Sequence, residues 1–528
     1  MSLRVGIDVG GTNTDAVVLD AGDRVIAKAK RPTTADVTGG LRAALDAVLA
    51  ALEPADHARI GRVMLGTTHA TNAVLERRNL GRVAVLRLGA PATTSVPPLA
   101  EWPDDLRAAV SAGEAIVPGG HYVDGRELAP PDLDAIRRFL EREADAVAVT
   151  AVFSPANAEH ELRVRDLVER EYGLPVSLSH EIGSLGLLER ENATVLNAAL
   201  YGVATAVTEA LTTALAERGL RATPYIAQND GTLMTVEHAA RLPVSTIGSG
   251  PANSLRGAAF LSGVPDAIVA DVGGTSTDLG VLVGGFPRES AAAVEIGGVL
   301  TNFRMPDVLA IALGGGTRVR GDGGDGVVLG PDSVGFRLAQ AALVSGGRSA
   351  TMTDAAVHGG RMREVPDGWH DNLRESLETH QGTETTEAWL VRALAVADEM
   401  AEDAVDRMTL GRTDRPLVVV GGGAFLLPGT LPGVSEVIRP EHAEVANAVG
   451  AAIALASGRV DTVIPAGAGR AAAIEEARRE AAARAVKAGA DPDRVEVVDV
   501  HEVPLSYLAE PAARLQVKAA GPLVTPSD

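Results

Sequence analysis

Two short stretches with the same chemistry recur far apart in the chain. Residues 8–15 read Asp-Val-Gly-Gly-Thr-Asn-Thr-Asp and residues 271–278 read Asp-Val-Gly-Gly-Thr-Ser-Thr-Asp, differing at one position. Paired glycines let backbone amides approach an anion closely, and the adjacent hydroxyl groups add donors. Asp8 and Asp271 precede the glycines, where a carboxylate can hold Mg²⁺ or orient a water beside a γ-phosphate. Two matched copies favour a phosphate site over two ordinary tight turns.

Each repeat lies between two apolar runs, as expected for a strand, a glycine turn and a second strand. The candidate phosphate-binding residues are therefore the turn residues of two β-hairpins: Gly10, Gly11, Thr12 and Asn13 in the first, and Gly273, Gly274, Thr275 and Ser276 in the second. Their separation far exceeds the period of solenoid repeats and indicates two homologous lobes.

A third glycine cluster follows the apolar strand expected at 416–420. Gly421, Gly422 and Gly423 could admit a flat adenine and a ribose against bare backbone, or could form a plain turn between a strand and a helix. The chain has no Gly-x₄-Gly-Lys-Ser/Thr loop, and the first glycine cluster leads into a strand rather than into the helix of a dinucleotide fingerprint.

A dense polar run, containing Thr67, Thr68, His69 and Asn72, follows an apolar strand. These groups could recognise a substrate, or Thr67 or Thr68 could cap a helix. His69 is a candidate general base, although a lone histidine is more often simply hydrogen-bonded. Asn229 and Asp230 also stand at a predicted strand end, where α/β proteins place ligands, but an Asn-Asp-Gly turn explains them equally well.

Another polar group, at 189–191, reads Glu-Arg-Glu at the start of a predicted helix. Acidic residues in a first turn suit the helix dipole, so a solvated turn is expected there. A contact with substrate or partner is the alternative.

Composition excludes several classes of function. The chain has 528 residues, a formal net charge of -21, 3% aromatic residues and no cysteine. Clustered basic residues, which nucleic-acid binding requires, are not indicated. Thiolate nucleophiles, disulfides and cysteine-bound metals are excluded. No stretch is apolar enough to cross a membrane and no leader peptide is recognisable, so we expect a cytoplasmic protein that binds neither nucleic acid nor membrane.

The elements that position these residues alternate between helices and short apolar strands, which indicates mixed α/β layers. Helices are expected near 39–53, 131–143, 187–218, 385–408, 444–457 and 471–488, with an irregular, proline- and glycine-rich excursion over 90–126. We expect an N-terminal lobe over 1–185, a second lobe with a helical insertion over 186–458, and a small C-terminal α/β appendage over 459–528.

As a set, these motifs resemble the hydantoinase/oxoprolinase family. The resemblance rests on the first hairpin, on Gly-Thr-Thr-His-Ala-Thr-Asn-Ala at 66–73, on Ser-His-Glu-Ile at 179–182, on Glu-Arg-Glu-Asn at 189–192, on Asn-Asp-Gly at 229–231 and on Ser-Gly-Pro-Ala-Asn-Ser at 249–254. It implies the two-lobed α/β fold of actin, hexokinase and the heat-shock chaperone ATPases, which is ribonuclease H-like. The two hairpins then look like phosphate loops, and 421–423 like the adenosine loop.

The resemblance also implies an activity. ATP and Mg²⁺ would drive hydrolysis of a cyclic amide of the hydantoin, 5-oxoproline or lactam type, with the γ-phosphoryl group transferred to the amide oxygen. Thr67, Thr68, Asn72, Asn229 and Asp230 are then candidates for the substrate end. A second subunit resembling hydantoinase B is expected, and a homo-oligomer is possible. The alternatives are a small-molecule kinase, the ATPase subunit of an acetone-carboxylase-type enzyme, and a nonenzymatic ATPase switch.

Overall fold

The computed structural model describes residues 2–34, 37–183, 185–290, 293–323, 326–379, 383–411, 414–505 and 511–524. The chain divides into two units. Unit 1 comprises Met1–Gly66, Ser249–Glu289 and Pro306–Ala454, and unit 2 comprises Thr67–Gly248, Ser290–Met305 and Leu455–Asp528. These units do not coincide with the expected divisions at 185 and 458, because strands from distant parts of the chain pair within each unit.

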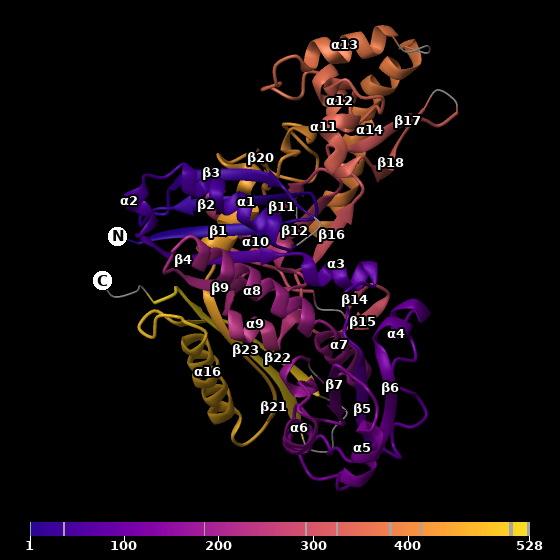
Figure 1. The fold of residues 1–528 in the computed structure, drawn as a ribbon, viewed down its shortest axis with the longest axis vertical. Coiled ribbons are helices and arrows are strands. Elements are labelled where there is room, and N and C mark those ends of the chain that lie inside the picture. The colour runs from indigo at the N-terminus through magenta and orange to yellow at the C-terminus, as the bar shows by residue number, and fades with distance from the viewer. Residues whose placement is uncertain are drawn as a thin grey trace. The chain divides into compact units, whose positions relative to one another are not determined.

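The first sheet of unit 1 carries the first repeat (Figure 1). Its strands lie in the order β4, β1, β2 and β3, which span Ile60–Thr67, Leu3–Val9, Asn13–Leu19 and Val25–Pro32. β1 and β2 form the predicted antiparallel hairpin, with Asp8 opposite Asp15. Helix α1, Val37–Ala50, packs on this sheet, and the short α2, Pro54–His57, precedes β4.

The second sheet of unit 1 repeats this arrangement. Its strands lie in the order β13, β12, β11, β19 and β20, with β16 beside β12; they span Phe286–Pro287, Thr277–Val283, Ile268–Val272, Leu417–Val420, Val437–Ile438 and Val308–Ile311. β11 and β12 form the second predicted hairpin, with Asp271 opposite Asp278. The parallel pairing of β11 with β19 brings residues that follow Val420 to the second repeat.

Helices α10 and α15, Ser249–Ser262 and Ala446–Ile453, cross closely within unit 1. A Cβ added at Gly257 would lie 1.8 Å from the carbonyl oxygen of Ala446, and one added at Gly450 would lie 1.8 Å from that of Asn253. Only glycine at both positions lets the two backbones approach this closely. The crossing brings polar residues of both helices to the hairpins.

The remainder of unit 1 is mainly helical and lies beyond β16 (Figure 1). It contains β17, β18, α11, α12, α13 and α14, which span Thr317–Gly321, Val327–Ser333, Leu338–Ala341, Met352–His358, Trp369–Thr379 and Thr383–Thr409. Its core is continuous with that of the second sheet, because buried residues of α12 and α14 pack with those of β11 and β19.

Unit 2 contains a parallel sheet in the order β6, β5, β7 and β8, spanning Ser111–Pro118, Val83–Ala90, Ala146–Ala151 and Val176–Leu178. Helices α3 to α7 belong to the same unit and span His69–Glu76, Asp104–Val110, Leu133–Leu140, Glu159–Tyr172 and Leu187–Ala199. The expected irregular excursion over 90–126 is wrong: it contains α4 and β6. β6 pairs with β5, a long-range contact that local composition does not reveal.

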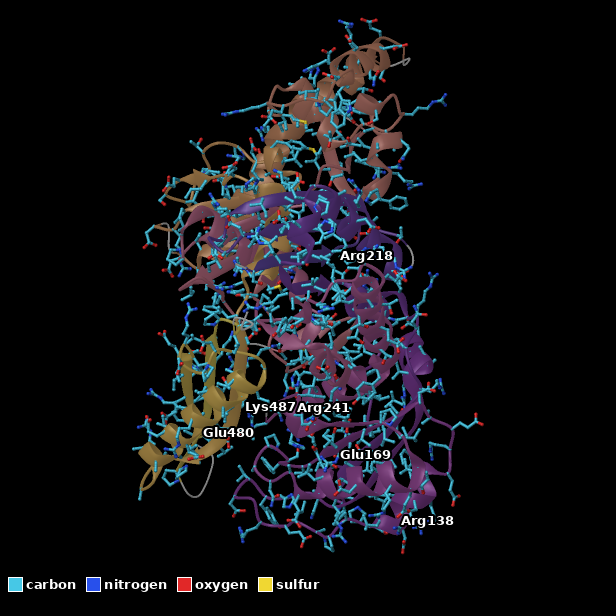
Figure 2. The ribbon with its side chains drawn as sticks, turned by 60° about the vertical axis from the view of Figure 1, so that its left-hand side comes forward. Arg138, Glu169, Arg218, Arg241, Glu480 and Lys487 are labelled. Carbon is cyan, nitrogen blue, oxygen red and sulfur yellow. The ribbon has the colours of Figure 1, made fainter. Side chains whose placement is uncertain are left out.

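The second sheet of unit 2 joins segments from the middle and the end of the chain. Its order is β22, β23, β21, β10 and β9, spanning Glu496–Leu505, Ala512–Gly521, Ala456–Pro465, Leu233–Thr235 and Thr223–Ala227. The short pair β14 and β15, Val294–Ile296 and Val299–Thr301, and helix α9, Val236–Arg241, complete the unit. Helix α16, Arg470–Lys487, has exposed charged side chains, among them Glu480 and Lys487, which are labelled in Figure 2, and it buries Ala477, Ala481 and Ala485.

The long helix expected over 187–218 is broken. It consists of α7 and of α8, Tyr201–Glu217, which meet at a 49° bend around Leu200. Across the described residues, no single helix has the length and apolar character needed to cross a membrane, and only this bent pair, taken together, meets the length and composition criteria.

Candidate functional site

The turns of both hairpins leave hydrogen-bond donors unused. Gly10 N donates to Asn13 O over 3.0 Å, and Gly273 N donates to Ser276 O over 2.9 Å, which closes each turn. The next two amides of each turn donate to no described residue, and neither do the side chains of Thr12, Asn13, Thr275 and Ser276. A Cβ added at Gly11 or Gly274 would meet no atom within 4 Å. Open space beside unused amides and hydroxyl groups is the chemistry of a phosphate loop.

The carbonyl oxygens of both turns, by contrast, accept hydrogen bonds from other residues of unit 1. Thr33 forms two hydrogen bonds with the first turn. Its amide donates to Thr12 O over 3.0 Å, and its hydroxyl donates to Gly10 O over 2.8 Å. Gly315 N and Gly316 N hold the second turn by donating to Gly273 O and Gly274 O over 3.0 and 2.7 Å. Fixing the acceptors sets the orientation of the peptide units, and therefore of their amide donors, before a ligand arrives.

Buried carboxylates lie at the base of the hairpins. Asp8 is 3% exposed and accepts hydrogen bonds from Asn253 Nδ2 on α10 over 3.1 Å and from Asn447 Nδ2 on α15 over 3.0 Å. Burial raises the pKa of Asp8 to about 7; the negative charges of Asp15 and Asp271 raise it further, while the asparagine donors oppose this. The two hairpins are therefore close enough for their carboxylates to repel each other, which favours a bound cation.

The second hairpin and its neighbours complete this cluster. Ser254 on α10 donates a short hydrogen bond from Oγ to Asp271 Oδ2, and burial nevertheless raises the pKa of Asp271. Burial also raises the pKa of Asp278, to about 7, with the charge of Asp271 adding to the effect. Lys30 Nζ on β3 lies 3.0 Å from Asp15 Oδ1 and supplies a positive charge that lowers the pKa of both Asp15 and Asp271 against the effect of burial.

The glycine loop after β19 packs directly on the second hairpin. Gly423 N donates to Val272 O over 2.7 Å. Gly421 has a φ of 88°, and a Cβ added there would lie 2.4 Å from Asp271 Oδ1. A Cβ added at Gly422 would have only Lys30 Nζ near it, at 3.9 Å. The structure thus brings 421–423 to the second hairpin and to Lys30.

The donor set fits Mg²⁺ held together with phosphate better than a metal cage made by protein alone. Among the described residues, no three His, Cys, Asp or Glu side chains form a metal-binding group. Mg²⁺ is commonly held by one or two carboxylates, with waters and substrate phosphates completing its shell. Asp8 and Asp271, buried and mutually repelling beside two turns with unused amides, match that mode.

The polar run at 67–72 lies in unit 2 at the start of α3. His69 Nδ1 lies 2.6 Å from Thr67 Oγ1, and burial lowers the pKa of His69, so that its imidazole is neutral at pH 7. Thr68 is the N-cap of α3 but makes no side-chain capping bond, and the side chain of Asn72 bonds to no described residue. Thr67 borders an apolar pocket of about 20 Å³, which is too small for a ring amide.

The side chains of Asn229 and Asp230 form hydrogen bonds and ion pairs with other residues of unit 2. Asn229 Oδ1 accepts a hydrogen bond from Gly248 N over 2.8 Å, and its Nδ2 donates to Val244 O over 3.0 Å. Asp230 Oδ2 lies 2.7 Å from Lys518 Nζ and 2.8 Å from Arg459 Nη2. Burial alone would raise the pKa of Asp230, but these two cations hold it far below its usual range. Both side chains support the fold at their positions.

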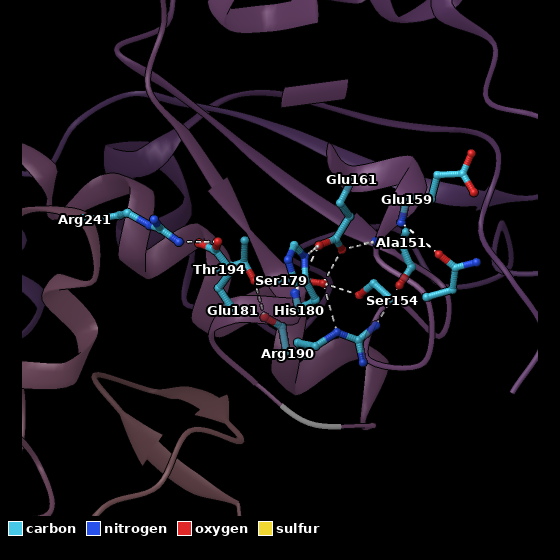
Figure 3. A network of polar contacts seen from close by, with 11 residues as sticks. Ala151, Ser154, Glu159, Glu161, Ser179, His180, Glu181, Arg190, Thr194 and Arg241 are labelled. Carbon is cyan, nitrogen blue, oxygen red and sulfur yellow. Dashed lines mark hydrogen bonds and ion pairs between the residues drawn. The ribbon is translucent and has the colours of Figure 1, made fainter. Parts of the chain in front are cut away.

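A buried polar network occupies the carboxyl ends of β7 and β8 (Figure 3). Glu161 on α6 accepts hydrogen bonds from Ser179 Oγ over 2.5 Å and from Ala151 N over 2.8 Å, and His180 Nδ1 lies 2.6 Å from it. Arg190 Nε donates to Ser179 Oγ over 3.0 Å. The Ser-His-Glu motif at 179–181, in the 3₁₀ helix that follows β8, is thus anchored by its serine and histidine.

The solvated turn expected at 189–191 is wrong. The Arg190 side chain is fully buried in the network of Figure 3, and Glu191 is 1% exposed. Glu191 forms two hydrogen bonds with Arg87 on β5, over 2.5 and 2.7 Å. Charge at the start of a helix does not distinguish a solvated turn from a buried ion pair whose partner is about 100 residues away in the sequence.

Sequence reasoning missed four residues of the carboxylate cluster: Lys30, Asn253, Ser254 and Asn447. The hairpin register offered a signal for Lys30, because it pairs with Asp15 on the neighbouring strand. Asn253 and Ser254 belong to a motif noted in the sequence, but their contacts depend on how α10 crosses α15. Asn447 stands in a predicted helix and has no local signal.

Known proteins resemble this chain over most of its length. The family model described as "Hydantoinase/oxoprolinase N-terminal region" matches residues 4–172, and the model described as "Hydantoinase/oxoprolinase" matches residues 190–460. The chain is 28% identical over 449 residues to the acetophenone carboxylase gamma subunit of Aromatoleum aromaticum, covering 75% of this chain and 60% of that one. It is 27% identical over 459 residues to caprolactamase subunit alpha of Pseudomonas jessenii, covering 80% and 65%.

The fold also matches a solved structure. The crystal structure of the ATP-dependent caprolactamase from Pseudomonas jessenii aligns with a TM-score of 0.75 at 21% identity, covering 99% of this chain and 88% of that one. This agreement, with the paired hairpins of unit 1, confirms the predicted mixed α/β fold. The chain spans 60% and 65% of the lengths of the acetophenone carboxylase gamma subunit and caprolactamase subunit alpha, less than two thirds of each. With two family models matched across nearly all of residues 4–460, the chain belongs to the hydantoinase/oxoprolinase family.

Proposed function

We propose that this protein uses ATP and Mg²⁺ to activate the carbonyl group of a cyclic amide, whose ring is then opened by water. The observation that carries the proposal is the pair of matched hairpins in unit 1, each with unused turn amides and hydroxyl groups and a buried aspartate at its base. The family assignment and the caprolactamase relative support a lactam-type substrate.

The residues of unit 1 have separate tasks in this proposal. The turn amides with Thr12, Asn13, Thr275 and Ser276 bind the phosphates, while 421–423 receive the adenosine. Asp8 and Asp271 hold Mg²⁺ or its waters, with Asn253, Asn447 and Ser254 fixing the carboxylate oxygens. Bound Mg²⁺ would neutralise phosphate charge. Positioning and charge neutralisation are the main requirements of phosphoryl transfer.

The chemistry itself proceeds in three steps. The amide oxygen attacks the γ-phosphorus and ADP leaves, which makes the former amide carbon electrophilic. Water then adds to that carbon and the C–N bond breaks, with the ring nitrogen taking up a proton, which leaves a ring-opened acyl phosphate. A second water hydrolyses this acyl phosphate, so that phosphate and a ring-opened amino acid are released. His69, neutral and partly buried in unit 2, is our candidate for accepting a proton from water, with Thr67 beside its imidazole.

We also propose that a second subunit resembling hydantoinase B takes part. Two relatives are named as gamma and alpha subunits, and this chain spans 60% and 65% of their lengths. Thr68 and Asn72 at the start of α3 remain candidates for substrate or partner contact. Asn229 and Asp230 are left out of the proposed substrate site because their side chains are held by internal partners.

A carboxylase role is the second candidate, because one relative is an acetophenone carboxylase subunit. The same ATP site would serve both reactions, so the two functions are distinguished by their other reactants. A carboxylase requires bicarbonate and a ketone, whereas an amide hydrolase requires only water and the cyclic amide.

The decisive experiment measures phosphate release from ATP and Mg²⁺ with hydantoin, 5-oxoproline, caprolactam, or acetophenone with bicarbonate. Asp271→Ala is compared with Asp307→Asn, which alters a partly exposed ion pair with Arg288 in the same unit. Stimulation by a cyclic amide without bicarbonate, lost only in Asp271→Ala, would support the proposal. Stimulation that needs bicarbonate would favour the carboxylase, and a phosphorylated product without free phosphate would indicate a kinase. No binding of ATP would refute the phosphate site.

A further inference from the structure

A pocket of about 240 Å³ lies in the helical part of unit 1, and none of its lining residues belongs to the hairpins or to 421–423. It is enclosed by β17, by the segment 343–350 before α12, and by α13 and α14. Its polar lining consists mainly of Arg318, Arg320, Arg348, Ser349, Thr386 and Trp389.

The polar groups that line this pocket include hydrogen-bond donors for which the described residues supply no acceptor. Arg318 Nε is buried and makes no hydrogen bond, and neither Arg318 nor Arg348 forms a hydrogen bond or ion pair with a side chain among the described residues. Arg320 pairs with Asp332, with both side chains about half exposed. The indole N–H of Trp389 and the hydroxyl of Ser349 likewise donate to no described residue. A ligand that satisfies this lining has to bring acceptor oxygens and negative charge.

The rest of the wall is mainly apolar. Val319 and Leu343 are buried, and Trp389 lies against Gly321 at the end of β17. A Cβ added at Gly321 would lie 2.6 to 2.8 Å from three atoms of the Trp389 indole, so the ring touches bare backbone there. An indole held in this way offers a fixed apolar surface beside the arginines, on which a ring can stack.

We propose that this pocket binds a small organic carboxylate that carries an apolar or aromatic ring. A guanidinium group matches a carboxylate with two parallel hydrogen bonds, and Arg318 and Arg348 have these donors available. The volume lies below the 300 to 1,000 Å³ that is usual for drug-sized ligands, which suits a one-ring acid. In a chain of net charge -21, three arginines around one cavity are a marked local excess of positive charge. The proposal does not depend on the reaction proposed above.

The test uses benzoate as the probe, with benzamide as its neutral isostere and inorganic phosphate as an anion without a ring. Binding to the full-length protein is measured by calorimetry and by tryptophan fluorescence. Benzoate is expected to bind at least tenfold more tightly than benzamide or phosphate, because only benzoate satisfies both the arginines and the apolar wall. Arg318→Lys and Arg348→Ala are each expected to weaken benzoate binding about tenfold or more, the loss of a charge-assisted hydrogen bond.

Two variants make the result specific to the pocket. Arg374→Ala removes an exposed arginine of α13 that pairs with Asp371 outside the pocket, and it should leave benzoate affinity unchanged. Trp389→Phe should abolish the fluorescence response while calorimetry still detects binding. Equal affinity for benzoate and benzamide, equal affinity for benzoate and phosphate, no binding of benzoate, or the same loss in Arg374→Ala as in Arg318→Lys would each overturn the proposal. A thermal unfolding midpoint matching that of the wild type shows that a variant is folded.

Discussion

Asn447 Nδ2 lies 3.0 Å from Asp8 Oδ2, although 439 positions separate the two residues. The same amide group lies 3.1 Å from Asp15 Oδ2, so one side chain of α15 bridges the two aspartates that bound the first hairpin. Both carboxylates are nearly fully buried. A neutral amide that donates to both lowers the cost of holding two negative charges together, as the proposed Mg²⁺ site would require.

Replacing Asn447 by alanine is therefore expected to affect both stability and nucleotide binding. Asp8 and Asp15 each lose a hydrogen bond in the interior, which should cost about 1–3 kcal/mol in the free energy of unfolding. Affinity for ATP with Mg²⁺ should fall at least about fivefold, since the carboxylates are no longer fixed. Urea denaturation measures the first effect, and calorimetry with a nonhydrolysable ATP analogue measures the second.

Asn372→Ala is the matched control for this prediction. Asn372 on α13 also donates from Nδ2, over 2.9 Å to Val344 O, but it contacts no hairpin residue. It should lower stability and leave nucleotide affinity unchanged. If both variants changed nucleotide affinity equally, the effect of Asn447 would be one of general stability rather than of positioning.

The glycine loop after β19 allows a comparison between adjacent residues. Gly421→Ala should abolish nucleotide binding and destabilise unit 1, because the new Cβ would meet Asp271 Oδ1 at 2.4 Å and the φ of 88° disfavours alanine. Gly422→Ala should fold normally, because its Cβ has room. Thermal unfolding and calorimetry of the two variants check this. Similar behaviour of the two would show that the close packing against Asp271 is unimportant.

The parts of this structure that sequence could predict are those that depend on neighbouring residues. The hairpins follow from apolar runs around Gly-Gly turns, and the structure confirms both of them. The break at Leu200 was missed, since helical residues continue across it. β6 was missed because its pairing with β5 is a long-range contact within a proline-rich region.

The candidate site, too, could be predicted only where neighbouring residues in the sequence identify it. Asp8 and Asp271 could be selected because their types and spacing repeat, but the residues that orient them come from α10, α15 and β3. The structural roles of Asp230 and Glu191 could not be predicted either, because their ionic partners, Lys518 and Arg87, lie far from them in the sequence. Where a polar residue finds a remote ionic partner, residue type alone does not separate a ligand-binding role from a structural one.

The buried pair between Arg87 and Glu191 should be strongly destabilised by removing one partner. Both side chains are at most 1% exposed, so Glu191→Ala leaves a buried guanidinium without its carboxylate and should cost about 3–5 kcal/mol. The double variant Arg87→Met with Glu191→Leu should recover part of the lost free energy of unfolding. The recovery should be incomplete because Arg87 also donates to Thr93 O and Val96 O. Denaturation of the single and double variants measures this, and a single variant as stable as the wild type would contradict it.

Asp230 provides a pH-dependent test of a structural role. Asp230→Asn leaves the buried Lys518 and the partly exposed Arg459 facing a neutral side chain, and at pH 7 it should cost about 3–5 kcal/mol in the free energy of unfolding. The pKa of Asp230 in the folded protein lies below that of the unfolded chain, about 3.9, because the two cations outweigh the effect of burial. Its contribution is therefore fully present above the unfolded pKa and is lost as pH falls toward the folded pKa.

The difference in unfolding free energy between the wild type and Asp230→Asn should thus stay constant from pH 7 to about pH 5 and shrink below about pH 4. Asp461→Asn, which removes a partly exposed pair with Arg514, should cost at most about 1 kcal/mol over the same range. Urea denaturation of the three proteins at several pH values provides the comparison. If Asp230→Asn cost no more than Asp461→Asn at pH 7, the buried cations would not depend on this carboxylate, and Asp230 would return to the candidates for substrate contact.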